Sequence, residues 1–166
     1  MRIACALLRW TVPIRIVLAL ATALTPAAVV AKTTMVIDAD VQRTCNVAAL
    51  PMMFGTIAVI FANATAQASI FVDCTPSTSF TIAIDNGQNF NGQRRMARIG
   101  PGFGNFLNYE IYRDAARAQR WGTTPAQVVT RVAPANGKMT LLAYGRATGS
   151  VAAGPFEDTV TVTITL

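Results

Sequence analysis

The sequence contains no histidine, and charged residues make up only 13% of its 166 residues. The absence of histidine removes the commonest general base, the usual activator of a nucleophile and the commonest metal ligand. With 52% apolar residues, the chain also lacks the composition that keeps a protein unfolded. We therefore expect one folded domain of ordinary size, without a catalytic centre built on histidine.

No other motif replaces the missing histidine chemistry. The serines have no lysine at an S-x-x-K spacing, so no base is placed to activate them. The glycine-rich stretch 100–104 does not match GxGxxG, and Pro101 lacks an N–H for a phosphate. The acidic pairs Asp38/Asp40 and Glu157/Asp158 fit solvated strand ends or turns. We expect no enzyme activity, no cofactor, no metal site and no small-molecule substrate.

Basic residues are unevenly distributed. Three of the fourteen lie in residues 1–31, which contain no acid, and the other eleven share residues 32–166 with all eight acids. The longer segment therefore has a net charge of +3, which is weak support for nucleic-acid binding. The densest cluster is formed by Arg94, Arg95 and Arg98. Without interleaved aromatic residues, it favours a solvated surface over a nucleic-acid site.

The first 31 residues have the pattern of a secretory signal peptide. Three arginines precede and flank a short apolar run over 16–24, and the segment that follows contains Pro26 and ends in small residues at Ala31. The alternative is an uncleaved membrane anchor, but the run is about half the length of ~20 residues that spans a bilayer. We expect cleavage before Lys32 and export of the mature chain.

The three cysteines agree with export. Cys5 lies in the predicted signal peptide, which leaves Cys45 and Cys74 as an even pair in an oxidising compartment. We predict a disulfide between them, which would stabilise the fold by roughly 3–4 kcal/mol through chain entropy. A metal or redox pair is the alternative, but there is no CxxC spacing and no histidine to complete a site.

The mature chain is dominated by short alternating stretches. In residues 160–166, valine, isoleucine and leucine alternate with threonine, which is the period of a half-buried strand. Clusters of Gly, Pro, Asn and Ser separate such stretches, so we predict an all-β sandwich. The expected strands are 35–42, 53–61, 69–74, 80–84, 107–112, 127–132, 139–146 and 160–166. A short helix is expected only over 114–121.

A series of short motifs in the mature chain is more specific. Cys45-x-Val47 and Asp85-Asn86-Gly87 come first, and a set of aromatic, acidic and glycine positions follows. These positions are Leu107, Tyr109, Tyr112, Asp114, Trp121, Gly122, Tyr144, Gly145 and Asp158. In this order, the set resembles the spore coat protein U (SCPU) domain family, which includes the pilin subunits of archaic chaperone–usher pili. The resemblance covers essentially the whole mature chain.

The resemblance implies an immunoglobulin-like sandwich that lacks its last strand and carries an N-terminal donor strand. A periplasmic chaperone would fill the gap first, and at the outer-membrane usher the donor strand of a neighbouring pilin would replace it. The implied domains are a signal peptide (1–31), a donor strand (32–42) and a pilin domain (43–166). The implied location is the periplasm in transit and then the cell surface, with a role in adhesion and biofilm formation.

The resemblance also assigns roles to two apolar rows. The inserting side chains of the donor strand would be Met35, Ile37, Ala39 and Val41. The acceptor groove, which the chaperone would also contact, would be lined by Val160, Val162, Ile164 and Leu166. Three alternatives remain: the N-terminal strand pairs within its own domain, the protein is a tip adhesin acting as a binding module, or it is a surface coat protein that forms no pilus.

Overall fold

The computed structural model describes residues 30–57, 63–100, 104–149 and 151–166. Almost all of the predicted signal peptide therefore lies outside the described residues. The chain divides into two units, the first ending at Ala39 and the second comprising residues 40–166. In the described part of the first unit, residues 30–39, there is no helix or strand and every residue is exposed.

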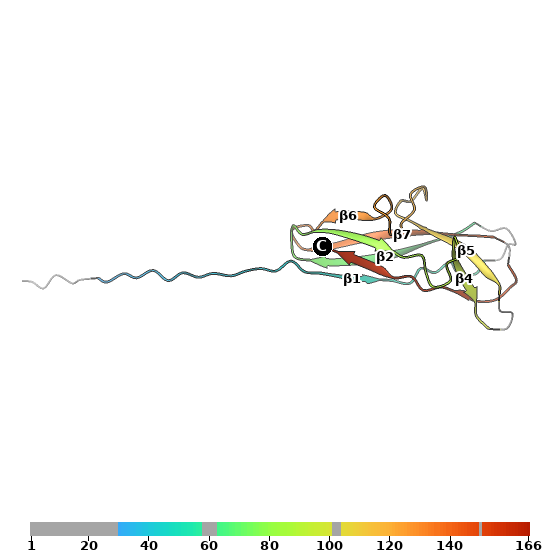
Figure 1. Ribbon diagram of the computed structural model, residues 1–166, viewed down its shortest axis with the longest axis horizontal. Helices are drawn as coiled ribbons and strands as arrows, with labels where there is room; N and C mark the ends of the chain where they lie inside the picture. Colours follow the sequence, from blue (N-terminus) through green and yellow to red (C-terminus); the bar gives the residue numbers. More distant parts are fainter. Residues whose placement is uncertain (1–29, 58–62, 101–103, 150) are drawn as a thin grey trace, which may run out of the picture. The chain divides into compact units, whose positions relative to one another are not determined.

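The second unit is all-β, which confirms the predicted fold class (Figure 1). Its described residues form nine strands. These are β1 (Cys45–Ala49), β2 (Ala64–Cys74), β3 (Ser79–Ile84), β4 (Arg94–Arg98), β5 (Phe106–Tyr112), β6 (Val129–Val132), β7 (Lys138–Thr148), β8 (Phe156–Glu157) and β9 (Val162–Thr165).

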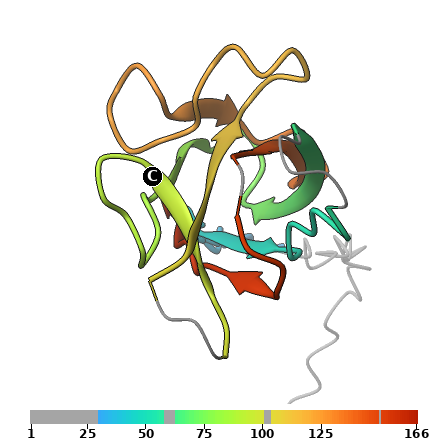
Figure 2. The same ribbon diagram turned by 90° about the vertical axis from the view of Figure 1, so that its right-hand side faces the viewer.

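The strands form two antiparallel sheets that pack as a sandwich. The larger sheet has the order β1-β2-β7-β5-β4-β8, and the smaller has the order β6-β3-β9. The last part of the chain passes from one sheet to the other, because β8 pairs with β4 and β9 pairs with β3. Figure 2 views the domain from the end where β4 and β5 lie in front.

Alternate residues of the strands form the core, as the two-residue period of the sequence predicts. In β3, Phe80, Ile82 and Ile84 are 1%, 0% and 2% exposed, while the residues between them point outward. Ile70 and Val72 of β2 are buried in the same way. Because successive side chains of a strand point to opposite faces, each strand contributes every second residue to the interior.

The disulfide is confirmed, and it joins the first two strands. Cys45 and Cys74 lie directly opposite each other in the pairing of β1 with β2, and their sulfurs are bonded. The bond ties β1, an edge strand of five residues, to the eleven-residue β2. It therefore secures an element that has a partner strand on one side only.

Three expected elements are not formed in the described residues. The predicted strand 35–42 is wrong for the single chain, because these residues are exposed and pair with no described strand. Residues 53–57 form no strand, and the rest of the predicted strand 53–61 lies outside the described residues. Residues 114–121 form turns instead of a helix. There the Asp114 carboxylate accepts hydrogen bonds from the backbone N–H groups of Ala118 and Gln119, and Arg117 has a φ of 55°. Local side-chain bonds of this kind compete with helix formation.

Candidate functional site: two unpaired strand edges

One face of β9 is apolar but incompletely covered. Val162 lies opposite Ile84 and Ile164 lies opposite Ile82, so both point toward the core. Yet Val162 and Ile164 are only half-buried, whereas the β3 residues beside them are almost fully buried. Val160 is also half-buried and packs against the core, and Leu166 at the end of the row is 59% exposed. The four residues predicted for an acceptor groove therefore form one partly uncovered row.

The main chain of β9 also has a free edge. Asp85 N–H donates to the Thr161 carbonyl at 3.0 Å, which makes this pair a hydrogen-bonded one. Bonded and non-bonded pairs alternate along an antiparallel ladder, so the N–H and C=O groups of Val162 and Ile164 point away from β3. No described strand pairs with them, because β9 is the last strand of its sheet.

β1 has a free edge of the same kind. Leu50 N–H donates to the Ser69 carbonyl at 2.9 Å, so by the same alternation the polar backbone groups of Cys45, Val47 and Ala49 point away from β2. Val47 is half-buried and packs against the core. Cα atoms of β1 and β9 approach within 8 Å, and the two strands lie near each other in Figure 1, but they do not pair.

The predicted donor segment is exposed along its length. Met35, Ile37 and Val41 are 80%, 83% and 74% exposed, and Ala39 is exposed as well. No described residue between 30 and 44 belongs to a strand. Regular attachment begins at Thr44, whose carbonyl accepts from the N–H of Thr75 at 2.9 Å.

Asp85, in the turn after β3, fixes the backbone of Thr161, the residue just before β9. One carboxylate oxygen of Asp85 accepts the N–H of Thr161 at 2.9 Å and the N–H of Gly87 at 3.0 Å. Burial alone would raise the pKa of Asp85, but these N–H donors and the charge of Arg94 outweigh it and lower the pKa. The carboxylate is therefore held in its charged form where β9 begins.

Asp158 makes a second attachment, and its placement corrects the expectation of a solvated turn residue. One of its oxygens accepts the Tyr109 hydroxyl at 2.6 Å, and the other accepts the backbone and side-chain N–H groups of Asn89 at 3.1 and 2.9 Å. Gly87 has a φ of +82°, and a Cβ there would lie 2.1 Å from Asp158. Glycine is thus required twice, by its conformation and by the close approach.

A buried arginine joins the same region to the core. Arg94 is 0% exposed, which corrects the expectation of a solvated basic cluster. Its guanidinium pairs with Glu110 and donates to the carbonyls of Ile84 and Trp121, both at 2.9 Å. Burial lowers the pKa of Arg94, although the negative charge of Glu110 acts to raise it. Buried charges need partners of this kind, and here every partner is distant in sequence.

The structure divides the motif residues between the two faces of the large sheet. Leu107, Tyr109 and Trp121 are buried, and the Trp121 indole donates to the Ile82 carbonyl at 3.0 Å. The buried glycines also pack closely, with Gly145 under Met52 and Phe54 and Gly122 against Gln127. Tyr112 and Tyr144 lie opposite each other on the outward face.

Three contributors were missed by the sequence reasoning. Asn89 was not expected to hold Asp158, and Arg94 and Glu110 were not expected to pair. The available signal was the turn Asp85-Asn86-Gly87, because Arg94 donates to the Asp85 carbonyl at 2.9 Å and Asp158 lies against Gly87. Among the described residues, no cluster of acidic residues and cysteines is suited to hold a metal ion, and no helix is long and apolar enough to cross a membrane.

The model of the Spore Coat Protein U domain matches residues 31–163, and no curated protein matches. A similar solved structure is the CsuC–CsuE chaperone–tip adhesion subunit pre-assembly complex from archaic chaperone–usher Csu pili of Acinetobacter baumannii, with a TM-score of 0.57 and 22% identity. The match covers 76% of this chain and 40% of that chain. On the family match, this chain belongs to the Spore Coat Protein U domain family.

Proposed function

We propose that the protein is a structural subunit of a surface pilus, assembled by the chaperone–usher pathway through donor-strand exchange. The observation that carries this proposal is the partly uncovered row Val160, Val162, Ile164 and Leu166, which lies beside a strand edge that pairs with no described strand. A soluble protein that leaves such an edge exposed risks uncontrolled pairing with other chains. In a pilus subunit, the same edge is the site of assembly.

The acceptor site would be the strip between β9 and β1. A strand added to β9 would bond to the outward-pointing backbone groups of Val162 and Ile164, and its alternate side chains would cover the apolar row. Hydrogen-bonded strands lie about 4.8 Å apart, so a strand bonded to both edges needs them about 10 Å apart. Because β1 and β9 now approach within 8 Å, insertion along both edges would move them apart.

The donor would be the N-terminal segment of a neighbouring subunit. Met35, Ile37, Ala39 and Val41 repeat every second residue, which is also the spacing of the acceptor row. Burial of these four side chains would contribute on the order of 5–9 kcal/mol before entropy costs. The three largest of them are at least 74% exposed here, so nearly all of their area is available for burial.

The remaining partners follow from this assignment. Residues 1–31 would direct export, a periplasmic chaperone would cover the β9 edge, and an outer-membrane usher would exchange the chaperone for the next subunit. The disulfide fits the oxidising periplasm. The assembled fibre would act at the cell surface in adhesion and biofilm formation.

A pair of substitutions tests the donor assignment. Ile37→Asp would place a charge in a dry groove and stop polymerisation while leaving chaperone binding intact. Val36→Asp is the matched control, because Val36 is 90% exposed and belongs to the opposite row. Surface material sheared from cells is run on an SDS gel without heating and after heating, and probed with an antibody to residues 32–166.

We expect wild type and Val36→Asp to give a ladder that collapses to a monomer on heating, and Ile37→Asp to give no ladder. Ladders of equal length from both variants would remove the donor assignment. A single monomer band from wild-type cells in both lanes would reject the pilus proposal, and a non-pilus coat protein would then be favoured.

A further inference from the structure

The outward face of the six-stranded sheet carries an ordered array of arginine, aromatic and amide side chains. The pairing registers place Gln67, Tyr144 and Tyr112 in one row across β2, β7 and β5. The next row along the strands contains Thr65, Arg146 and Glu110. All of these residues point away from the core, because Ala143, Gly145 and Ile111 between them are buried.

The following row continues the array onto β4. Asn108 lies opposite Thr148 on one side and Arg95 on the other. Rows on one face of a strand are about 6.8 Å apart, and two strands span about 9.6 Å, so the Cα atoms of Arg146 and Arg95 are roughly 12 Å apart. Long arginine side chains at that separation are able to contact one extended ligand together.

The two arginines of these rows, Arg95 and Arg146, and Arg117 in the turn after β5 each lie over an aromatic ring of the array. The guanidinium carbon lies 4.0 Å from the ring centre for Arg95 on Phe106, 5.5 Å for Arg146 on Tyr112 and 5.9 Å for Arg117 on Tyr144. Cation–π contacts of this kind hold the guanidinium over the ring. Arg95 donates its Nε–H to the Asn89 carbonyl, and Arg117 donates to the carbonyls of Gly145 and Ala115, which leaves the other N–H groups of these guanidinium forks for a ligand. Among the described residues, no carboxylate lies within salt-bridge distance of the three arginines.

No ion pair among the described residues neutralises Arg95, Arg146 or Arg117. Glu110 is occupied by Arg94 and Arg120, and Asp73 pairs with Lys138. Within the strands that the structure describes in this sheet, Glu157 is the one carboxylate outside an ion pair. The surface therefore presents three arginines outside ion pairs beside polar amides, and the exposed Glu157, opposite Ala97 of β4, is the nearest free carboxylate in the sheet order.

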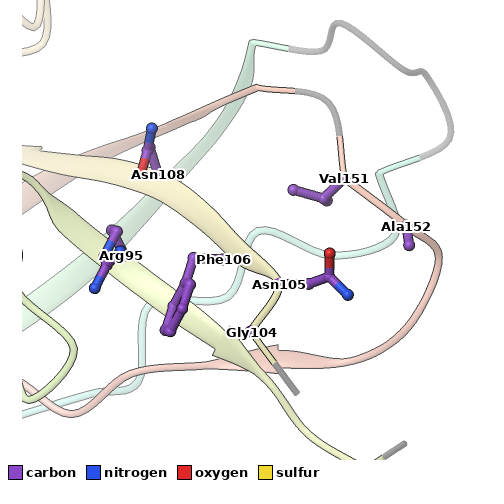
Figure 3. Close-up of a pocket in the computed structure, with 7 residues that line it drawn as sticks. All are labelled: Arg95, Gly104, Asn105, Phe106, Asn108, Val151 and Ala152. Atoms are coloured by element: carbon purple, nitrogen blue, oxygen red, sulfur yellow. The ribbon is translucent and has the colours of Figure 1, made fainter. Parts of the chain in front are cut away.

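A shallow hollow of about 660 Å³ lies at the β4–β5 end of the array (Figure 3). Its lining includes Arg95, Phe106 and Asn108 from β4 and β5, together with Gly104, Asn105, Val151 and Ala152. Figure 3 shows Arg95 and Phe106 next to each other on neighbouring strands, with Val151 and Ala152 across the hollow. Such a hollow is open enough to accept a ring of a longer polymer.

We propose that this outward face binds an acidic polysaccharide. The carboxylates of uronic-acid units would pair with Arg95, Arg146 and Arg117, and the sugar hydroxyls would bond to the amides of Asn108 and Gln67. Charge-assisted bonds from arginine to carboxylate are the strong ones, and their fork geometry suits a carboxylate. A single-stranded nucleic acid fits less well, because it needs open aromatic faces for base stacking and here arginines cover the rings.

The test measures binding of polygalacturonate to the full chain, purified in the assembled form in which it accumulates. Neutral dextran and single-stranded DNA are the comparison polymers. The variant is Arg95→Gln with Arg146→Gln. The control carries the same charge change elsewhere, as Arg43→Gln with Arg131→Gln, since both of these residues are exposed and outside the array. Melting temperature and assembly size are compared first, so that only folded proteins enter the comparison.

We expect wild type to bind polygalacturonate with an affinity that falls as salt rises, and not to bind dextran. The Arg95/Arg146 variant is expected to bind on the order of tenfold more weakly, through the loss of two charge-assisted contacts. The control is expected to bind like wild type. Equal weakening in both variants would show attraction by net charge and overturn the proposal. Absence of binding to polygalacturonate, or tighter binding to DNA, would also overturn it.

Discussion

Replacement of Tyr109 by phenylalanine tests the attachment that precedes β9. The side chain is 7% exposed, and its hydroxyl donates to Asp158 at 2.6 Å. Burial is the main cause that raises the pKa of Tyr109, and the bond to Asp158 adds to it, so the hydroxyl keeps its proton. Phenylalanine retains the ring in the core and removes only this donor.

The expected loss follows from the geometry. A hydrogen bond to a charged group contributes about 1.5–3 kcal/mol, and removal of one partner leaves the other to be solvated. Asp158 keeps two bonds from Asn89 and is only half-buried, which places the loss near the lower part of that range. We expect Tyr109→Phe to lower the free energy of unfolding by about 2 kcal/mol, or the melting temperature by roughly 5–10 °C.

The assay is thermal denaturation of the full chain, with wild type and variants in the same assembly state. Tyr112→Phe is the matched control, because Tyr112 lies three residues further along β5 and points outward. Within the described part of the chain, its hydroxyl makes no hydrogen bond. This control is expected to melt within about 2 °C of wild type, since surface changes rarely exceed ~0.5 kcal/mol. Equal melting temperatures for the two variants would refute the role given to Tyr109 and Asp158.

Two further predictions concern other attachments of the edge strands. Cys45→Ala opens the bond between β1 and β2 and should cost roughly 3–4 kcal/mol, so that periplasmic subunit yield falls; unchanged yield and protease resistance would contradict this. Asp85 has a lowered pKa when folded, so its contribution is present above pH about 4 and is lost as the pH falls through the folded value. Asp85→Asn should therefore melt lower than wild type at pH 7, and the difference should shrink in melts recorded toward pH 2.5; a constant difference would contradict the assignment.

Several strands follow directly from the sequence because their alternation is strict. The predictions for 80–84, 107–112 and 139–146 coincide with β3, β5 and most of β7. Turn chemistry at Asp85-Asn86-Gly87 correctly ends β3. Such local patterns predict strands because the apolar and polar residues of a half-buried strand alternate every two residues, whichever strand it pairs with.

The burial of the β4 residues cannot be predicted from local sequence patterns. Arg94 and Arg95 are neighbours of one chemical type, so a sequence pattern cannot say that one is fully buried and the other points outward. Arg94 is accommodated only because carbonyls from Ile84 and Trp121 and the carboxylate of Glu110 converge on it. β8 has two residues, which is too short to display any period.

The sequence alone determined the all-β class, the cysteine pair and the two apolar rows, because each depends on residue type and local spacing. Tertiary structure alone decided which strand edges remain unpaired, because pairing depends on contacts between segments far apart in the chain. It also placed Asp85 and Asp158 as anchors of the segment that leads to β9, and it gathered Arg95, Arg146 and Arg117 on one face. A period of two fixes which side chains share a face of a strand, but only the sheet order fixes what that face meets.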